Sequence, residues 1–370
     1  RAMLGHARSN PAQRGIPAVP DAPDYPAGFG QQRIWMLEQL NTGHLAVYNI
    51  AQSFRVRGRL DEAALRRAFR LLVHRHEPLR TVFSEKHSGL RQIILGEDVF
   101  DLQTVDLSAE HDPEQYFREI AERHASRPFN LEKGPLIRML FCRMGSAPDG
   151  LCVAVHHSVC DGQSLPVLMR DLDVLYSVES GLARPEPQPG TCRYRDFTSW
   201  QRDRMGSGGS ADAESYWKSV FASLPEPLAL PLDFPRPSVQ RFDGAHHHVW
   251  IDADQVRALE QLGASGGCSL FMTLLAAFQV FLMKYCGQED VVVGCPVSGR
   301  VHPDLENLVG LFINTLAYRG RWTEGQSFAS YLGYVRQSVL QSLEHQDYPF
   351  DHLVEVLKVE RDPGRSPLFD

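Results

Sequence analysis

The chain has 370 residues, of which 43% are hydrophobic and 22% charged, and its formal net charge is -7 at pH 7. This is the composition of a globular protein with enough residues for two lobes that each bury a core. It excludes a disordered or fibrous protein, and the negative charge argues against nucleic acid, whose binding needs a concentrated basic face.

The first segment, residues 1–27, is rich in Pro, Ala and Gly and lacks the apolar core of a signal peptide. We interpret it as an interdomain linker within a longer polypeptide. Helical spacing of apolar residues then predicts helices at 30–40 and 61–76. Alternation predicts a strand at 48–58, and the segment 79–95 predicts a hairpin that turns at "KHSG".

Two apolar runs, at 136–144 and 151–157, are joined by "GSAPDG" and predict a second hairpin. Its second strand ends at the paired histidines, which strand alternation places on opposite faces, His157 outward and His156 toward the interior. A helix follows, and we expect Ser164 to be its N-cap.

After this helix the composition turns to Pro, Gly and charge, so we place the lobe boundary there, with an N-terminal lobe at 28–185 and a C-terminal lobe at 186–370. The second half again predicts helices, at 269–287 and 327–346, with a buried strand at 289–297 between them. Because strands and helices alternate in both halves, the fold class is α/β (α+β) with two lobes.

Cysteine usage and apolar runs indicate the compartment. The chain has seven cysteines, an odd number, and no two are spaced as CxxC, so neither a disulfide framework nor a cysteine zinc site is predicted. Reduced thiols favour a cytoplasmic protein. The longest apolar runs are too short and too interrupted to span a bilayer, so no membrane association is predicted.

The chemistry-bearing residues gather in "HHSVCDGQS", from His156 to Ser164. A zinc site would need three or four convergent ligands, and divergent histidines supply at most one, so we predict no metal. The second histidine cluster, at 246–248, is interpreted as surface or strand. Another alternative is that Cys160 is a nucleophile activated by His157. The competing interpretation of Cys160 is an inert cysteine in a turn.

A third interpretation makes His157 a general base. Imidazole titrates near neutral pH and can take a proton from an amine or an alcohol. Asp161 would anchor the site, and Gly162 would let a substrate approach the backbone where free N–H groups face developing negative charge. The alternative is that the histidines are core residues whose ring nitrogens are hydrogen-bonded inside the protein. Four fixed positions at a strand-to-helix junction favour the catalytic interpretation.

The motif "HHSVCDG" resembles the HHxxxDG signature of the condensation domains of nonribosomal peptide synthetases, members of the chloramphenicol-acetyltransferase-like superfamily. Six further segments, between Gly28 and Asp370, match the other family motifs in order: "GFGQQRIWMLEQL", "RHEPLRTVF", "YRDFTSW", "GLFINTLAYR", "HQDYPFD" and "RDPGRSPLFD". In the first of these, Gly28 and Gly30 replace the usual Ser and Ala.

The resemblance implies two lobes, each a mixed sheet flanked by helices, that meet in a V with an active-site tunnel between them. It implies amide bond formation between a donor acyl or peptidyl thioester and an acceptor aminoacyl thioester. Both would be carried on the 4'-phosphopantetheine of upstream and downstream carrier proteins, beside an adenylation domain, with no cofactor bound to this domain. We expect the excised domain to be monomeric and the native polypeptide to continue with further strands and helices of the second lobe.

Alternative activities of homologous domains remain open. Epimerisation would need other late motifs, and "GLFINT" argues against it. Heterocyclisation would replace the histidines with aspartates, which this chain does not do. An ester-forming homologue and a catalytically silent domain that only recruits a partner are further alternatives, the second opposed by the intact His157, Asp161 and Gly162.

The resemblance also implies roles for individual residues. His157 would orient or deprotonate the attacking α-amine and help to stabilise the tetrahedral intermediate. His156 and Asp161 would be structural, and Asp161 would pair with an arginine, for which Arg300 is the first candidate and Arg80 the second.

The remaining site residues lie around the substrates in this scheme. The acceptor channel would include Gly162, Gln163 and Ser164, and Asn314 would line the tunnel. The common family form HHxxSDGWS is altered at Cys160, which we expect to be harmless in a turn. It is also altered at Gln163, where loss of an aromatic residue would change the choice of acceptor. "YNI" at 48–50 leans toward the subtype that joins an L-configured donor to an L-acceptor.

Overall fold

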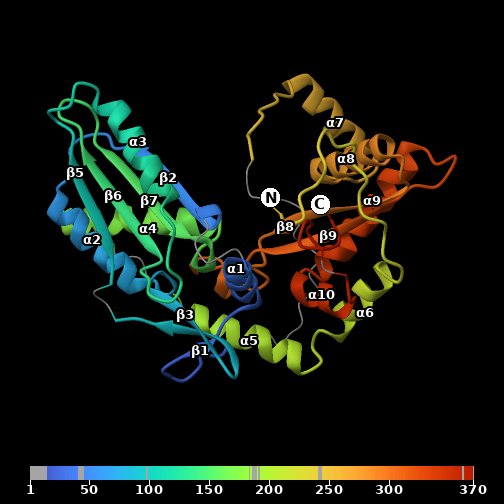
Figure 1. The fold of residues 1–370 in the computed structure, drawn as a ribbon, viewed down its shortest axis with the longest axis horizontal. Helices are drawn as coiled ribbons and strands as arrows, with labels where there is room; N and C mark the ends of the chain where they lie inside the picture. Colours follow the sequence, from blue (N-terminus) through green and yellow to red (C-terminus); the bar gives the residue numbers. More distant parts are fainter. Residues whose placement is uncertain are drawn as a thin grey trace. The chain divides into compact units, whose positions relative to one another are not determined.

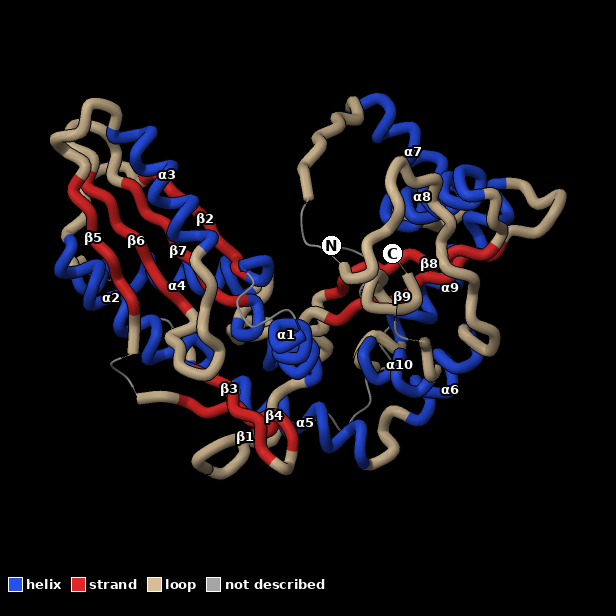
Figure 2. Tube along the Cα trace, viewed as in Figure 1, coloured by secondary structure: helices blue, strands red, loops and turns tan. Residues whose placement is uncertain are grey.

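The computed structural model describes residues 15–40, 46–96, 99–182, 184–185, 190, 192–240, 244–360 and 362–369. The chain forms two compact units (Figures 1 and 2). Unit 1 comprises Arg1–Gly206 and Arg300–Phe312, and unit 2 comprises Ser207–Gly299 and Ile313–Asp370.

Unit 1 contains helices on both faces of a mixed sheet. Its strands are β1 Tyr25–Pro26, β2 Asn49–Arg55, β3 Thr81–Lys86, β4 Gly89–Ile94, β5 Asp101–Asp106, β6 Ile137–Arg143 and β7 Gly150–His156. Its helices are α1 Phe29–Leu40, α2 Glu62–Arg75, α3 Pro113–Ser126, α4 Ser164–Glu179 and α5 Tyr194–Gly206. The 3-10 turns are η1 Ala46–Tyr48, η2 Glu77–Arg80, η3 His157–Val159 and η4 Pro303–Leu305.

The main sheet of unit 1 has the order β2-β7-β6-β5. β7 is antiparallel to both neighbours, and β5 is parallel to β6. Leu151 and Val153 of β7 pack into the core formed with α2 and α4, whereas Cys152 packs with α3 on the opposite face (Figure 1). Helices therefore cover both faces, as the nearly continuous apolar sequences of β6 and β7 require.

Local sequence accounts for the elements that flank this sheet. Asp61 caps α2 by accepting a hydrogen bond from the Ala64 N–H at 3.0 Å, and the apolar residues of α2 lie on one buried face. The hairpin predicted at 79–95 is confirmed as β3 and β4, which pair antiparallel and turn at residues 87–88. This hairpin also pairs with β1 in a separate three-stranded sheet.

The segment 15–27, predicted as part of a free linker, is built into unit 1. Ile16 is buried, and its N–H donates to Asp304 Oδ2 at 3.0 Å. The Val19 N–H donates to Asp196 Oδ1 at 2.8 Å. The segment is held because carboxylates and the edge of β4 satisfy its backbone groups, which a free linker would leave to water. Residues 1–14 lie outside the described residues.

The observed division of the chain differs from the boundary predicted at 185. Unit 1 continues through α5 to Gly206 and takes in the segment 300–312, which lies between β8 and β9 in the sequence. The reason is a shared core: Tyr194 and Phe197 of α5 pack with Leu305 and Phe312. A cluster formed by residues more than 100 positions apart leaves no signal in local composition.

Unit 2 is built around an antiparallel pair of strands, β8 Asp290–Val297 and β9 Asn314–Arg321. Its helices are α6 Ala211–Val220, α7 Ala253–Ser265, α8 Leu270–Cys286, α9 Phe328–Glu344 and α10 Phe350–Val356. No described helix alone is long and apolar enough to cross a membrane, and only α7 and α8 together, bent by 97°, meet that criterion by length and composition.

Candidate functional site

The residues singled out in the sequence form a loop between β7 and α4. β7 ends at His156, and His157 begins the short turn η3. The expectation that His157 is the last strand residue is therefore wrong by one position, because the chain turns after His156 and the Cys160 N–H bonds the His157 carbonyl. The two imidazoles still have different environments, since His156 is buried and His157 only half-buried.

His156 is an interior residue, with 1% of its surface exposed. Its Nδ1 accepts the Ser158 N–H at 3.3 Å, which places the ring proton of a neutral imidazole on Nε2. Nε2 lies 3.7 Å from Glu38 Oε1. Burial lowers the pKa of His156, an effect that Glu38 opposes. His156 is thus a neutral residue that holds the loop.

Asp161 connects three parts of unit 1. Its Oδ1 accepts the N–H of Ser164 at 2.7 Å and a guanidinium N–H of Arg300 at 3.0 Å, and its Oδ2 accepts the Phe312 N–H at 3.2 Å. The carboxylate therefore caps α4, whereas the sequence predicted Ser164 as the cap. Gln163 holds the N-cap position without a side-chain capping bond, while Ser164 is already helical and its hydroxyl bonds the carbonyl and the N–H of Gly310.

Arg300 pairs with Asp161 inside the protein, where their side chains are 5% and 1% exposed. Its guanidinium also donates to the carbonyl oxygens of Leu305 and Leu308, and it lies over the Phe312 ring at 4.1 Å. A buried ion pair with this many hydrogen bonds fixes the geometry of its surroundings. The segment 300–312 is thus folded around the arginine that neutralises Asp161.

Arg80, the second candidate, does not pair with Asp161. It ends η2, and its guanidinium donates to the Leu95 carbonyl at 2.6 Å while its own carbonyl accepts the Leu95 N–H. This arginine fastens the β3–β4 hairpin, because its position at the foot of β3 faces the end of β4.

A glycine in the segment 300–312 permits its close approach to α5. A Cβ at Gly310 would lie 2.1 Å from Tyr194 Cδ2. The Tyr194 hydroxyl donates to the Leu311 carbonyl at 2.7 Å. Any larger residue at Gly310 would push this segment away from the tyrosine and from Ser164.

His157 itself has few protein partners. Its Nδ1 is buried and has no hydrogen-bond partner among the described residues. Gly162 and Gln163, which follow in the loop, are exposed, and no atom lies within 4 Å of a Cβ built on Gly162. The loop therefore combines a partly exposed imidazole with an open stretch of backbone directly before α4.

Cys160 is not suited to be a nucleophile. It is fully buried in the main apolar core, and burial raises the pKa of its thiol far above the usual range. A protonated, inaccessible thiol is inert. The interpretation of Cys160 as a harmless substitution fits this environment, although it lies in the core as well as in a turn.

Two residues of α1 that the sequence analysis missed hold the loop from the other side. Gln31 is buried, its Nε2 donates to the Ser158 carbonyl at 3.1 Å, and its Oε1 accepts the Gly28 N–H at 2.9 Å. Glu38 faces His156, as described above. With Ile34 and Trp35 these residues form the buried face of α1. In the sequence, the signal for this role of α1 is that two polar residues lie on the apolar face of the predicted helix.

Asn314 belongs to unit 2. Its Nδ2 donates to the carbonyl oxygens of Gln346 and Tyr348, and its Oδ1 accepts the Phe350 N–H. These bonds tie β9 to the start of α10.

The described residues contain no group of three or more His, Cys, Asp or Glu side chains able to hold a metal ion, and residues 246–248 are exposed outside regular structure.

Comparisons with known proteins cover nearly the whole chain. A family model described as Condensation domain matches residues 22–370. A linear gramicidin synthase of Brevibacillus parabrevis is 40% identical over 362 residues, 97% of this chain and 5% of that protein. Tyrocidine synthase 2 of the same organism is 37% identical over 368 residues, 100% of this chain and 10% of that protein. The chain thus spans a tenth or less of these relatives.

Solved structures share the fold. The X-domain from teicoplanin biosynthesis is 26% identical, with a TM-score of 0.86 over 96% of this chain and 78% of that chain. The starter condensation domain of rhizomide synthetase RzmA, solved with C8-CoA and Leu-SNAC, is 25% identical, with a TM-score of 0.78 over 94% of this chain and 77% of that chain. The predicted fold class, a mixed helix-and-sheet fold of the chloramphenicol-acetyltransferase-like type, is confirmed.

Proposed function

The chain belongs to the condensation-domain family of nonribosomal peptide synthetases, and we propose that it catalyses amide bond formation between two carrier-bound thioesters. The observation that carries the proposal is the environment of His157. It is the partly exposed histidine of a loop that is otherwise locked by Asp161, Arg300 and the buried His156. A rigid loop that presents one imidazole is the arrangement that acyl transfer needs.

In this proposal the acceptor's α-amine attacks the carbonyl carbon of the donor thioester. A neutral amine needs orientation more than a strong base, so His157 positions it by a hydrogen bond and receives its proton as the tetrahedral intermediate collapses. The thiolate of the donor arm is the leaving group, and the proton ends on that thiol. Gly162 and Gln163 border the acceptor, and the backbone before α4 faces the developing charge.

The partners in the proposal follow from the relatives, which are synthases ten or more times longer than this chain. An upstream carrier protein delivers the donor and a downstream carrier protein delivers the acceptor, each on 4'-phosphopantetheine, and the adjacent adenylation domain selects the acceptor. The solved starter condensation domain that holds both C8-CoA and Leu-SNAC supports a two-substrate reaction. The domain itself needs no bound cofactor.

The proposal is tested by reconstitution with donor and acceptor carrier proteins loaded with thioesters. We expect His157→Ala to lower the rate of product formation by about 100-fold or more, the scale of a lost proton-transfer or positioning group. The control is His87→Ala, which alters an exposed histidine in the β3–β4 turn. Unchanged product formation by His157→Ala would refute the assignment.

The same assay separates the alternatives. A domain that binds loaded carriers but forms no product, with or without His157, would be a silent recruitment domain. A change in the configuration of the donor without transfer would indicate an epimerase. If a hydroxyl-bearing acceptor reacts and an amine does not, the product is an ester.

Acceptor choice is assigned to Gln163 in this proposal. The side chain is exposed directly before α4 and makes no capping hydrogen bond to that helix. We expect Gln163→Trp, which restores the aromatic residue common in the family, to change the ratio of kcat/KM values between acceptors. The control measurement is the melting temperature of the variant, which should differ from that of the unmodified domain by no more than about 2 °C because the position is exposed.

A further inference from the structure

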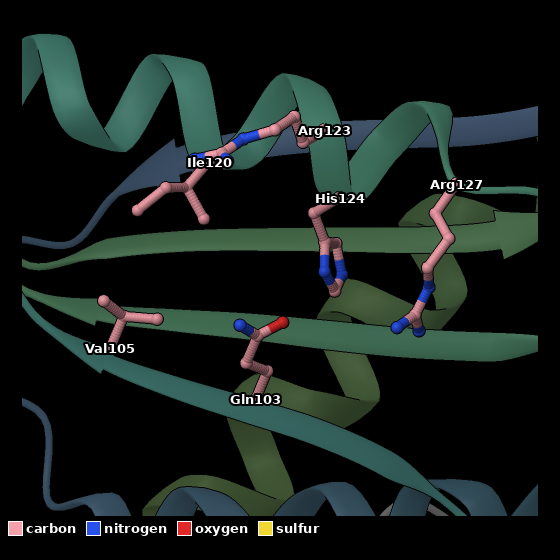
Figure 3. A pocket seen from close by; sticks show the side chains of 6 residues that line it. All are labelled: Gln103, Val105, Ile120, Arg123, His124 and Arg127. Atoms are coloured by element: carbon pink, nitrogen blue, oxygen red, sulfur yellow. The ribbon is translucent and has the colours of Figure 1, made fainter.

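A hollow of about 330 Å³ lies in unit 1 beside the edge strand β5. It is lined by Gln103 and Val105 of β5 and by Ile120, Arg123, His124 and Arg127 at the C-terminal part of α3 and just beyond it (Figure 3). The hollow lies where α3, which packs chiefly over β2, β7 and β6, makes few contacts with β5. None of its lining residues belongs to the loop between β7 and α4.

His124 is the most informative residue of this hollow. Only 6% of its surface is exposed, and its Nε2 is buried without a hydrogen-bond partner among the described residues. Figure 3 shows its ring projecting from α3 into the space above the sheet. A buried ring nitrogen without a bond costs stability, so it calls for a polar group in the hollow.

The charge around the hollow is predominantly positive. Arg123 and Arg127 are exposed at its rim, and Arg138 lies directly behind it, with its guanidinium bonded to the His124 carbonyl. Asp101 is the counter-charge, and it pairs with Arg127 at 2.5 Å. The three arginines thus outnumber the one carboxylate that pairs with them at the hollow.

This surplus of positive charge also acts on the histidine. Burial first, and then Arg138 and Arg127, lower the pKa of His124 to about 4. The imidazole is neutral at pH 7, and an anion in the hollow would offset the arginines and favour its protonation.

We propose that this hollow binds a small organic oxyanion, a carboxylate or a phosphate monoester with a short apolar chain. Its head group would lie between the Arg127 guanidinium group and the His124 Nε2–H, where charge-assisted hydrogen bonds are strong. Gln103 lies across from His124, with its amide oxygen on the side of the ring and its amide nitrogen on the side of Val105 (Figure 3). The apolar chain would contact Val105 and Ile120, and the volume is at the lower end of the range of small-molecule sites.

The site is connected to the loop between β7 and α4 by two contacts. Arg138, which holds the His124 carbonyl, lies over the Phe129 ring at 3.8 Å, and that ring meets His156 edge-on with a centroid distance of 5.9 Å. A ligand that moves the end of α3 therefore acts next to the histidine that anchors the loop. The binding itself is independent of the proposed function of the domain.

The test is a ligand titration of the whole domain with its histidines labelled with ¹³C and ¹⁵N, monitored by NMR at constant ionic strength. The probes are sodium butyrate and n-butyl phosphate, which distinguish the two head groups, inorganic phosphate, and 1-butanol, which lacks the charge. We expect saturable shifts of the His124 ring signals with at least one of the two organic anions, and a rise of the His124 pKa when that anion is bound. Arg127, Arg138 and Asp101 are the charged groups that act on this ring and take part in that titration.

Variants decide the outcome. Arg127→Gln, at an exposed position, should weaken binding at least tenfold, whereas Arg118→Gln, on the exposed side of α3 where it pairs with Glu114, should leave it unchanged. His124→Gln tests the ring directly. Non-saturating shifts, equal binding by the two arginine variants, or equal binding of 1-butanol would each overturn the proposal. Shifts with inorganic phosphate alone would mean an adventitious ion only and would overturn it as well.

Discussion

Asp161 shows how much of the site depends on one carboxylate. It accepts hydrogen bonds from the start of α4, from Arg300 and from the Phe312 backbone. These bonds join the loop to the start of α4 and to both ends of the segment 300–312, and the Asp161 side chain is only 1% exposed. The aspartate of the motif therefore acts as a structural centre for the loop, while His157 remains accessible within it.

Asp161→Asn should strongly destabilise unit 1. The substitution removes the charge of Asp161 from its buried pair with Arg300, and removal of one partner of such a pair costs about 3–5 kcal/mol. Chemical denaturation measures the effect. Asp173→Asn is the control, because the Asp173 side chain is 68% exposed in its pair with Arg184. A stable but inactive Asp161→Asn protein would instead give this residue a direct role in catalysis.

Three buried histidines predict how stability depends on pH. Burial lowers the pKa values of His76, His124 and His156 below 6.5, that of His124 to about 4. The unfolded chain therefore binds more protons than the folded one in acid. For His124 this stabilising contribution is complete above pH 6.5 and is lost as the pH falls toward 4, by about 1.4 kcal/mol per pH unit, and His76 and His156 act in the same direction. Urea denaturation between pH 4 and 8 measures this slope, and His124→Gln should reduce it.

At the scale of elements, α1 acts as a brace for the loop between β7 and α4. Gln31 donates a hydrogen bond to the Ser158 carbonyl, and Glu38 faces His156. Both residues lie about one helical turn from Trp35, which packs in the core. The loop therefore packs against a helix that is itself anchored by apolar contacts. This explains why a helix far away in sequence carries one of the family's motifs.

Gln31→Ala should leave the Ser158 carbonyl buried without its donor. Such a loss costs about 1–3 kcal/mol and loosens the backbone next to His157. We expect kcat to fall more than KM rises, because the change affects orientation rather than substrate contacts. Gln39→Ala, on the exposed side of the same helix, is the matched variant. Equal kinetics for the two variants would rule out the bracing role of Gln31.

At the scale of the whole molecule, the chain passes between the two units three times, after Gly206, Gly299 and Phe312. Unit 1 is incomplete without the segment 300–312, which supplies Arg300 to Asp161 and Leu305 and Phe312 to the core with α5. Unit 1 is therefore assembled from two stretches of chain that are separated in the sequence by residues 207–299 of unit 2.

Residues 1–206 expressed alone should fold poorly. The fragment lacks Arg300 and exposes the apolar cluster around Tyr194 and Phe197. Near-ultraviolet circular dichroism should be weak and should recover when a peptide of residues 300–312 is added. The same peptide with Arg300→Ala is the control and should restore much less. A fragment with native packing in the absence of peptide would contradict this dependence.

Sequence pattern alone determined the elements whose signals are local. The 3.6-residue period predicted α2, and alternation with a turn predicted β3 and β4, because side-chain burial repeats with the backbone geometry. The motif HHxxxDG located the loop before α4, and the resemblance that rests on it and six other motifs is confirmed at the level of the family.

Only the tertiary structure decided which residues meet in that loop. Asp161 lies 139 positions from Arg300, and the sequence analysis kept Arg80 as a second candidate for its partner. The contacts of Gln31 and Glu38 with the loop, the inclusion of 300–312 in unit 1 and the binding of residues 15–27 to α5 also depend on the tertiary structure. Such pairings depend on how the elements pack, and packing energies between distant residues leave no periodic trace along the chain.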